Sequence, residues 1–522
     1  MKKALKITGL LLIVLLAGLF IWMNRNMKDR HPDYNINMEV ISKKTSSLLA
    51  GFAAATITPQ VPDRWVDKDS NARYEPKKGD TYIDGNGNGI FDPVWIAGFH
   101  NNKPANGIHD DLWARSMIID DGRTRLAIVS IDAIGLMNDD IIDIRNMLPP
   151  DAAITFLTVT STHNHETPDL MGLWGNSMFR SGVNPEYLAL VKKQIVQSVI
   201  TATKNLRPAL FEISEDPTGA IPLVKDTRKP EVFDSGLRLI KAVDKEKGNT
   251  LGCLISWADH AETLWSRNLL ITSDFVHYLR EGVEKGVFKG DTLVKKGIGG
   301  IAVFVNGAIG GLMTTHSSLA VKDPFTGIEY TDPSFEKAEA QGRTLSLLAL
   351  TAMENPVETI NSAGISLVAR NITLPIQNTL FKLGTALGVL NRGTSGWMKI
   401  RTEISAFTFG SVSFVNIPGE IYPEIVNGGI EAPEGRDFDI QPLEVPAIRE
   451  LMKGKHKFVI GLANDEIGYI IPKSQWDHKA PFSYGVERSP YGEVNSVGSE
   501  TAPLIHAGVR NVLKQLNQKN QD

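Results

Sequence analysis

Short apolar runs alternate with amphipathic segments along most of this chain. Uninterrupted apolar runs predict buried strands, and apolar residues that recur every three or four positions predict helices. The predicted strands lie at 125–132, 153–161, 237–243, 251–257, 300–306 and 458–462, with a pair of strands within 404–417. The predicted helices lie at 139–147, 185–205, 274–287, 335–354 and 501–516. This mixture predicts an α/β (mixed α+β) fold with several layers and mixed sheets.

The N-terminal segment, residues 1–30, has a different pattern. Three lysines precede an uncharged run at 7–23, which as a helix would be about 25 Å long. That is slightly short for a hydrocarbon core of about 30 Å and long for the apolar part of a signal peptide, and no A-x-A site follows. The segment predicts export, either with a membrane anchor or as a secreted or periplasmic protein. A buried soluble helix is disfavoured because the segment is apolar on all faces.

The remaining chain is predicted to be a linker followed by one domain. Residues 31–48 are polar, and no Pro/Gly/Ser-rich stretch divides residues 49–522. With 42% hydrophobic and 22% charged residues among 522, the chain can bury a large core. A net charge of −4 without a long basic run argues against nucleic acid as a partner. The single cysteine, Cys253, leaves His, Asp, Glu and Tyr as the ligands for any metal.

A histidine pair follows the predicted strand 153–161. His163 and His165 are two residues apart, so in an extended segment both side chains project to the same side. Neutral imidazoles on one side suit Zn²⁺, and the carboxyl ends of strands are common ligand sites. Both rings could bind the metal, or one could bind it while the other carries protons. Two hydrogen-bonded loop histidines remain the alternative.

Three further polar residues follow predicted strands. His260 comes shortly after the strand at 251–257, Glu420 follows the strand pair at 404–417, and Tyr469 lies beyond the strand at 458–462. Each alone is typical of an ordinary structural or solvated position. Together with the histidine pair, His260 and Glu420 become candidates to complete one metal site at the strand ends.

The sequence resembles the catalytic domain of the neutral, non-lysosomal ceramidase family over roughly residues 49–500. The resemblance depends on short motifs that occur in the family's order. These are residues 50–59 (AGFAAATITP), 107–115 (GIHDDLWAR), 126–132, 162–169 (THNHETPD), 257–260, 270–274 (LITSD), 416–420 and 464–469. The resemblance implies a zinc-dependent hydrolase that cleaves an N-acyl sphingoid lipid, a linear amide, into a fatty acid and a sphingoid base.

The resemblance also implies roles for individual residues. The zinc ligands would be His163, His260, Glu420 and Tyr469. His165 would lie beside the metal and the substrate carbonyl, and Arg228 loosely matches an active-site arginine.

Two departures from the family pattern concern the nucleophile and the C-terminus. Met313 stands where the family has a serine proposed as a nucleophile, and Thr314 is the nearest hydroxyl. Residues 470–522 are fewer than the roughly 100 of the family's C-terminal immunoglobulin-like domain. A zinc-activated water does not require the serine, so hydrolysis of an amide, or of an ester, remains the expectation. A non-catalytic, ligand-binding relative is the alternative.

A second cation site is predicted in an Asn/Gly-rich segment. Oxygen donors recur at alternate positions, as in a calcium loop but without its terminal glutamate. The donors would be Asp84, Asn86, Asn88, Asp92 and the carbonyl of Ile90. The interpretation is a structural Ca²⁺ site, with an ion-free turn as the alternative.

Two apolar segments are candidates for a substrate pocket. Residues 378–398 carry Phe381, Leu383, Leu387 and Leu390 at helical spacing. They predict either core packing or an apolar flap over a pocket. Leu170, Met171, Leu173 and Trp174 follow the histidine pair and predict either an acyl pocket or ordinary core.

Overall fold

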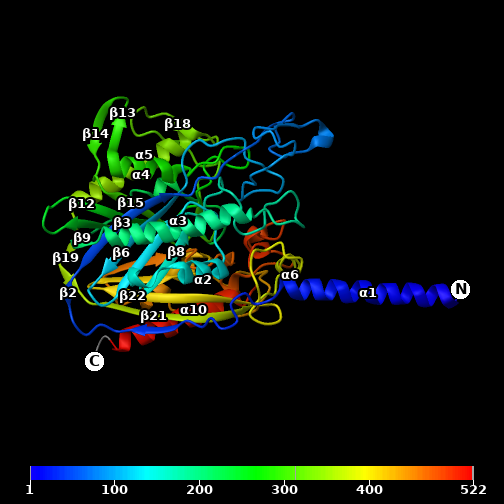
Figure 1. Cartoon of the computed structure of the whole chain (residues 1–522). Coiled ribbons are helices and arrows are strands. Elements are labelled where there is room, and N and C mark those ends of the chain that lie inside the picture. Colours follow the sequence, from blue (N-terminus) through cyan, green and yellow to red (C-terminus); the bar gives the residue numbers. More distant parts are fainter. Residues whose placement is uncertain (1, 312, 520–522) are drawn as a thin grey trace.

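Two β-sheets packed face to face form the centre of the protein (Figure 1). The computed structural model describes residues 2–311 and 313–519. The larger sheet has nine strands and is mostly antiparallel, but β7 and β8 are parallel and so are β12 and β15. Its order is β15 (Ile301–Asn306), β12 (Thr250–Trp257), β11 (Leu237–Asp244), β9 (Arg207–Asp216), β3 (Leu49–Thr56), β6 (Trp113–Asp120), β7 (Arg125–Ile131) and β8 (Phe156–Ser161), with β19 (Glu358–Ile360) also on β9.

The smaller sheet has five strands and contains one parallel pair, β23 with β25. Its order is β1 (Asn37–Val40), β21 (Ile365–Pro375), β22 (Lys399–Phe409), β23 (Val412–Asn416) and β25 (His456–Ile460). The edge strand β1 lies within residues 31–48, which the sequence predicted to be a linker. It pairs with β21 along its whole length, and Met38 and Val40 pack on the core. Its alternation of polar and apolar residues is typical of an edge strand with one buried face.

Aromatic and branched side chains fill the space between the sheets. Phe211, Ile240 and Val303 come from the nine-stranded sheet, and Phe407 and Phe414 come from the five-stranded sheet. The rings of Phe407 and Phe414 stack with centroids 4.4 Å apart. Burial of each such side chain stabilises the fold by about 1.5–3 kcal/mol. This shared core fixes the two sheets relative to each other.

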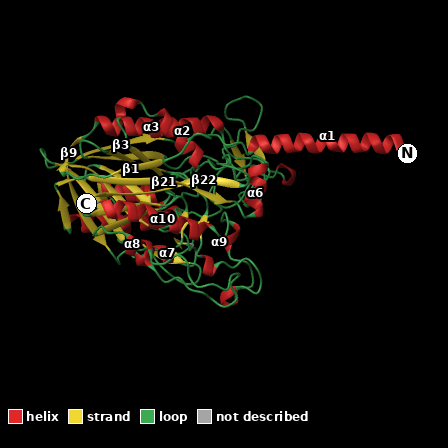
Figure 2. Ribbon diagram, turned by 90° about the horizontal axis from the view of Figure 1, so that it is seen from below, coloured by secondary structure: helices red, strands yellow, loops and turns green. Residues whose placement is uncertain are grey.

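Helices cover the outer faces of both sheets. On the nine-stranded sheet lie α2 (Asn138–Met147), α3 (Pro185–Lys204), α4 (Phe275–Lys285) and α5 (Phe335–Glu354). On the five-stranded sheet lie α7 (Pro423–Asn427), α8 (Ile448–Leu451) and α10 (Thr501–Lys519) (Figure 2). The start of α3 follows from its sequence, since the Asn184 side chain accepts hydrogen bonds from two backbone amides and Pro185 occupies the first turn. The mixed α+β fold predicted from the sequence is thus confirmed.

Shorter elements complete the fold. The remaining helices are α1 (Lys2–Asn26), α6 (Thr379–Ala386) and α9 (Tyr491–Val494). The remaining strands form pairs: β2 (Ser46–Ser47) with β20 (Ser362–Ala363), β4 (Arg64–Val66) with β5 (Thr81–Ile83), β10 (Lys225–Asp226) with β16 (Met313–Thr314), β13 (Gly286–Lys289) with β14 (Thr292–Lys296), β17 (Val321–Lys322) with β18 (Glu329–Tyr330), and β24 (Glu420–Ile421) with β26 (Tyr469–Ile470).

Candidate metal centre

Four strands from the two sheets end at the same place. His163 follows β8 and His260 follows β12, both in the nine-stranded sheet, while Glu420 and Tyr469 follow β23 and β25 in the five-stranded sheet. The loop after β25 is attached to β8, because Asn464 exchanges hydrogen bonds with the backbone amide and carbonyl of Val159. The structure therefore brings the carboxyl ends of strands from both sheets together around one cluster of polar side chains.

Two histidines are oriented by main-chain oxygens. His163 donates from Nδ1 to the carbonyl of Ile134 over 2.7 Å, and His260 donates from Nδ1 to the carbonyl of Met313 over 2.6 Å. Each Nδ1–H is thereby fixed, so that a metal would be bound through Nε2 of each ring. Both Nε2 atoms face the same oxygen of Glu420.

The backbone of His163 differs from the extended segment that the spacing suggested. β8 ends at Ser161, and His163 has a φ of +55°, in the left-handed region that few residues except glycine adopt. The two histidines still lie together, with ring centroids 4.9 Å apart, because of this turn and not because of strand alternation. Such backbone strain, about 1–3 kcal/mol per residue, is typical of functional sites.

Glu420 and Tyr469 are paired by the backbone. β24 and β26 form a two-residue parallel ladder whose register sets Glu420 beside Tyr469. The Glu420 carboxylate lies 3.0 Å from Nε2 of His260 and 3.5 Å from Nε2 of His163, and the Tyr469 hydroxyl lies 3.3 Å from Nε2 of His260. All four side chains are buried. The ligands implied by the family resemblance are thus within contact distance of one another.

These separations suit a tetrahedral ion. Donor atoms at about 2.0–2.1 Å from a tetrahedral Zn²⁺ lie roughly 3.3–3.4 Å from one another. The three measured separations, 3.0, 3.3 and 3.5 Å, are close to that value. Two imidazoles, a carboxylate and a phenol are also a donor set that zinc accepts, so the residues present fit the metal.

His165 offers a second way to complete the site. Ligand atoms of His163, His165 and His260 all lie within 4.8 Å of one another. Both ring nitrogens of His165 are buried, and no described residue gives them a hydrogen bond. The ring is confined by Gly98, where an added Cβ would lie 2.8 Å from Nδ1 of His165. Buried, unpaired nitrogens need a partner such as a metal, a water or a substrate.

The electrostatics of the cluster favour a cation beside Glu420. Burial lowers the pKa of His163 to about 4, and burial together with the two neighbouring histidines lowers the pKa of His165 well below its usual value. Burial also acts against a charged His260, but its hydrogen bond to Glu420 and the charge of Glu262 outweigh it and raise the pKa to about 9. The two neutral rings keep lone pairs for a metal, and the carboxylates attract positive charge.

Thr314 and His165 share one carboxylate that sequence analysis did not single out. Glu262 accepts a hydrogen bond from the Thr314 hydroxyl, and its other oxygen lies 3.4 Å from Nδ1 of His165. Met313 packs in the apolar cluster with Trp257, while its carbonyl orients His260. Glu262 lies only two residues after His260, and this spacing is the feature by which it could have been found.

Glu466 is the second residue that was missed. It lines the same small cavity as His163, His165, Glu420 and Tyr469, and its Oε2 is buried without a hydrogen-bond partner in the described part of the chain. Burial and the neighbouring Glu420 raise its pKa well above the usual range, which favours the protonated form. It belongs to the block at 464–469, whose tyrosine alone had been considered.

Arg228 lies in a neighbouring cavity. It forms an ion pair with Glu424 and stacks on Tyr422, with its guanidinium carbon 4.0 Å from the ring centroid. This cavity has a volume of about 710 Å³, against about 60 Å³ for the cavity at the histidines, and Tyr491 lines both. Tyr422 in turn packs on Tyr469, so the ring of Tyr422 lies between Arg228 and the candidate zinc ligand Tyr469. A role for Arg228 in catalysis therefore stays a prediction.

The segments predicted to form a pocket reach the small cavity in part. Phe381, Met171, Leu173 and Trp174 line it. Leu390 is buried with Met171. The other members differ: Leu170 belongs to the core under α3, and Leu383 is exposed.

The predicted calcium donors lie in an exposed loop. Asp84 accepts hydrogen bonds from the backbone amides of Gly87, Asn88 and Gly89, and these bonds lower its pKa. Asp92 accepts hydrogen bonds from the side chains of Asn86 and Asn88. The loop thus satisfies many of its oxygens internally, and a calcium site here stays a prediction.

Solved structures share this fold. No family model and no curated protein matches the sequence. The crystal structure of neutral ceramidase from Pseudomonas aeruginosa is similar with a TM-score of 0.62 and 15% identity, over 91% of this chain and 75% of that chain. A ceramidase complexed with C2 is similar with the same TM-score and identity, over 91% of this chain and 76% of that chain. The chain therefore has a neutral ceramidase-like fold, and the resemblance inferred from the sequence is confirmed at that level.

Proposed function

We propose that this protein is an exported, zinc-dependent amidohydrolase that cleaves an N-acyl lipid amide with zinc-activated water. The observation that carries the proposal is the donor set of His163, His260, Glu420 and Tyr469, whose measured separations are 3.0–3.5 Å. The neutral ceramidase-like fold supports the same class of reaction. The apolar helix α1 supports export, since it fits a signal anchor or a signal peptide.

The side chains around the donor set have separate tasks. Bound zinc supplies a Lewis acid for the scissile carbonyl and lowers the pKa of a bound water to about 7. His165 is placed to stabilise the oxyanion or to carry a proton, because neither of its nitrogens has a hydrogen-bond partner among the described residues. Glu262 positions His165 and Thr314. Glu466 lines the same cavity and has a raised pKa, so it is placed to donate a proton to the leaving amine.

The cavity walls support an acyl substrate. Met171, Leu173, Trp174 and Phe381 provide an apolar wall beside the histidines. The larger cavity offers charged groups, including Arg228 and Lys225, for the polar part of the substrate. Ceramide itself is one member of this chemical class, and the volume next to the metal does not distinguish it from other N-acyl amides.

Metal analysis with a substrate panel tests the proposal. The purified full chain should contain about one zinc, and His163→Ala should lower hydrolysis of fluorogenic N-acyl amides by about 10³-fold or more. His478→Ala, at an exposed histidine, is the matched control. Full activity of a metal-free preparation would refute the proposal.

Two other outcomes would assign the alternatives. Zinc binding without hydrolysis of any amide or ester would indicate a non-catalytic binding relative, which the replacement of the family's serine by Met313 favours. Hydrolysis of esters alone would indicate an esterase on the same scaffold.

A further inference from the structure

The helix α1 leaves the body of the protein beside α6. Figure 1 and Figure 2 both show α1 projecting alone, with α6 at its base. Its segment Lys6–Asn26 has a mean hydropathy of 2.3, and the rest of the described chain buries none of it. An apolar surface of this size requires lipid or another protein to cover it.

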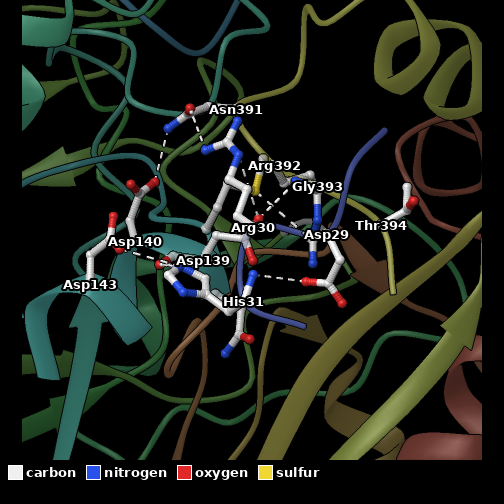
Figure 3. A network of polar contacts seen from close by, with 12 residues as sticks. Asp29, Arg30, His31, Asp139, Asp140, Asp143, Asn391, Arg392, Gly393 and Thr394 are labelled. Atoms are coloured by element: carbon white, nitrogen blue, oxygen red, sulfur yellow. Dashed lines mark hydrogen bonds and ion pairs between the residues drawn. The ribbon is translucent and has the colours of Figure 1, made fainter. Parts of the chain in front are cut away.

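The residues at the base of α1 are bound directly to the body of the protein. We call residues 26–31 the anchor base. Met27 is buried, and its carbonyl accepts hydrogen bonds from the hydroxyl and the backbone amide of Thr394. Arg30 donates to Asn391, and His31 contacts the carbonyl of Asp139 on α2 (Figure 3). Gly393 approaches so closely that an added Cβ would lie 2.3 Å from the carbonyl oxygen of Lys28.

The loop that holds the anchor base also reaches the metal centre. Arg392 lies between the two, and its guanidinium pairs with both carboxylate oxygens of Asp465 at 3.2 and 3.1 Å. Asp465 is adjacent to Glu466, which lines the small cavity. Phe381, on the helix that precedes this loop, lines the cavity as well. The position of the anchor base therefore determines where the cavity lies relative to α1.

Exposed apolar side chains surround this attachment. On α6, Leu380 is 59% exposed and Leu383 is 44% exposed, and Trp397 in the following loop is 66% exposed. Arg25, Lys28 and Arg30 are exposed at the end of α1. Apolar side chains with a ring of basic residues are typical of a surface that lies in the lipid headgroup region.

We propose that α6 and the loop through Trp397 are a bilayer-contacting surface, placed at the membrane by the docking of α1. In this proposal, the lipid bilayer that α1 spans covers this surface, because the anchor base holds the end of α1 directly beside α6. It follows that the wall of the cavity formed by Phe381 lies next to lipid. If the proposed function holds, an N-acyl lipid enters the metal centre from the bilayer through this side.

Site-specific fluorescence quenching tests the contact without any enzymatic assay. The only native cysteine, Cys253, is buried, so one introduced cysteine can be labelled selectively. We would label Leu383→Cys with bimane in the full chain, reconstituted into phosphatidylcholine–phosphatidylglycerol vesicles that carry a headgroup-level nitroxide lipid. Leu15→Cys, at the middle of α1, reports insertion when an acyl-chain nitroxide lipid replaces the headgroup-level one, and Leu293→Cys, 49% exposed on β14 at the far end of the molecule, is the matched control.

We expect severalfold quenching at Leu383, and none at Leu293. The proposal would be overturned if the label at Leu15 is quenched while the label at Leu383 is as unaffected as that at Leu293. It would also be overturned if the label at Leu15 is not quenched. A blue shift at Leu383 without quenching would assign the surface to a protein partner, which also overturns it.

A second measurement addresses the route of the substrate. The double variant Leu380→Asp/Leu383→Asp should lower the ratio of activity on a vesicle-borne N-acyl lipid to activity on a water-soluble N-acyl amide by about tenfold. Leu293→Asp should leave that ratio unchanged. An equal effect on both substrates would overturn the route. A wild-type chain that cleaves neither substrate would refute the proposed function, while the quenching result would still decide the membrane contact.

Discussion

Two regions of this protein were predicted from the sequence to bind a cation, and they are built in opposite ways. At the candidate metal centre, backbone carbonyls hold the Nδ1–H groups of His163 and His260 so that both Nε2 atoms face Glu420, and both nitrogens of His165 lack a hydrogen-bond partner among the described residues. In the loop at Asp84, the carboxylates accept hydrogen bonds from the loop's own amides. Spacing in the sequence does not separate the two cases.

A donor set can bind a metal readily only if its lone pairs are not already used in other contacts. A metal must replace whatever already occupies the donor's lone pairs, so donors that are buried and unpaired bind it at little cost. In the exposed loop, calcium would have to displace hydrogen bonds and compete with water. We therefore expect a large dependence on zinc at the first region and a small dependence on calcium at the second.

Removal of the metal should have the largest effect. Dialysis against 1,10-phenanthroline should lower the rate of hydrolysis by about 10³-fold or more. The centre would keep the side chains that orient the substrate carbonyl but would lose the Lewis acid. Zinc should restore the activity, and calcium should not. Restoration by calcium alone would remove the distinction between the two regions.

Replacement of Glu420 distinguishes two possible donor sets, one with Glu420 and Tyr469 beside two histidines and one of three histidines. Glu420→Gln keeps the size of the side chain and removes its charge, so the affinity for zinc should fall by about 100-fold, measured by competition with a chromogenic chelator. Glu329→Gln, at an exposed position on β18, is the control. If zinc is held by His163, His165 and His260 instead, Glu420→Gln will have little effect and His165→Ala will release the metal.

The carboxylate between His165 and Thr314 should affect turnover more than metal binding. Glu262→Gln should lower kcat by about tenfold, since the amide can satisfy Thr314 but does not stabilise a charged His165. The zinc content should stay at about one per chain, and the pH dependence of kcat should change. A parallel loss of zinc would place Glu262 among the groups that hold the metal.

The smallest effect is expected at the Asp84 loop. Calcium at tenfold its Kd would stabilise the folded protein by about 1.4 kcal/mol. For a chain of this size the corresponding rise in Tm is about 1–2 °C. Differential scanning fluorimetry with and without calcium would measure it, and Asp84→Ala should remove the response. A Tm that is indifferent to both calcium and EGTA would assign the loop to an ion-free turn.

Hydrophobic periodicity accounted for much of the fold where one face of an element is buried. The helix predicted at 335–354 has those bounds in α5. The strand predicted from residue 153 begins only at Phe156, because a short helical turn ends at Ala153 with a φ of +50°, which no apolar pattern indicates. β9 was not predicted, since Glu212 and Glu215 interrupt its apolar run.

The site was accessible from the sequence only in part. Each ligand candidate could be placed after a strand, but periodicity does not say which strands are neighbours, so the complete ligand set with Tyr469 came from the family resemblance. The two-residue pairing of Glu420 with Tyr469 is too short to leave a pattern. The role of Glu466 depends on the cavity that it shares with His163 and His165 from the other sheet, which no local spacing encodes.

The carbonyl of Met313 has one further consequence. It is a main-chain atom, yet it fixes the ring of His260. Position 313 can therefore exchange its side chain in the course of evolution without releasing this histidine, provided that the new side chain fits the apolar cluster. The side chain at position 313 and the orientation of the imidazole at position 260 can thus vary independently.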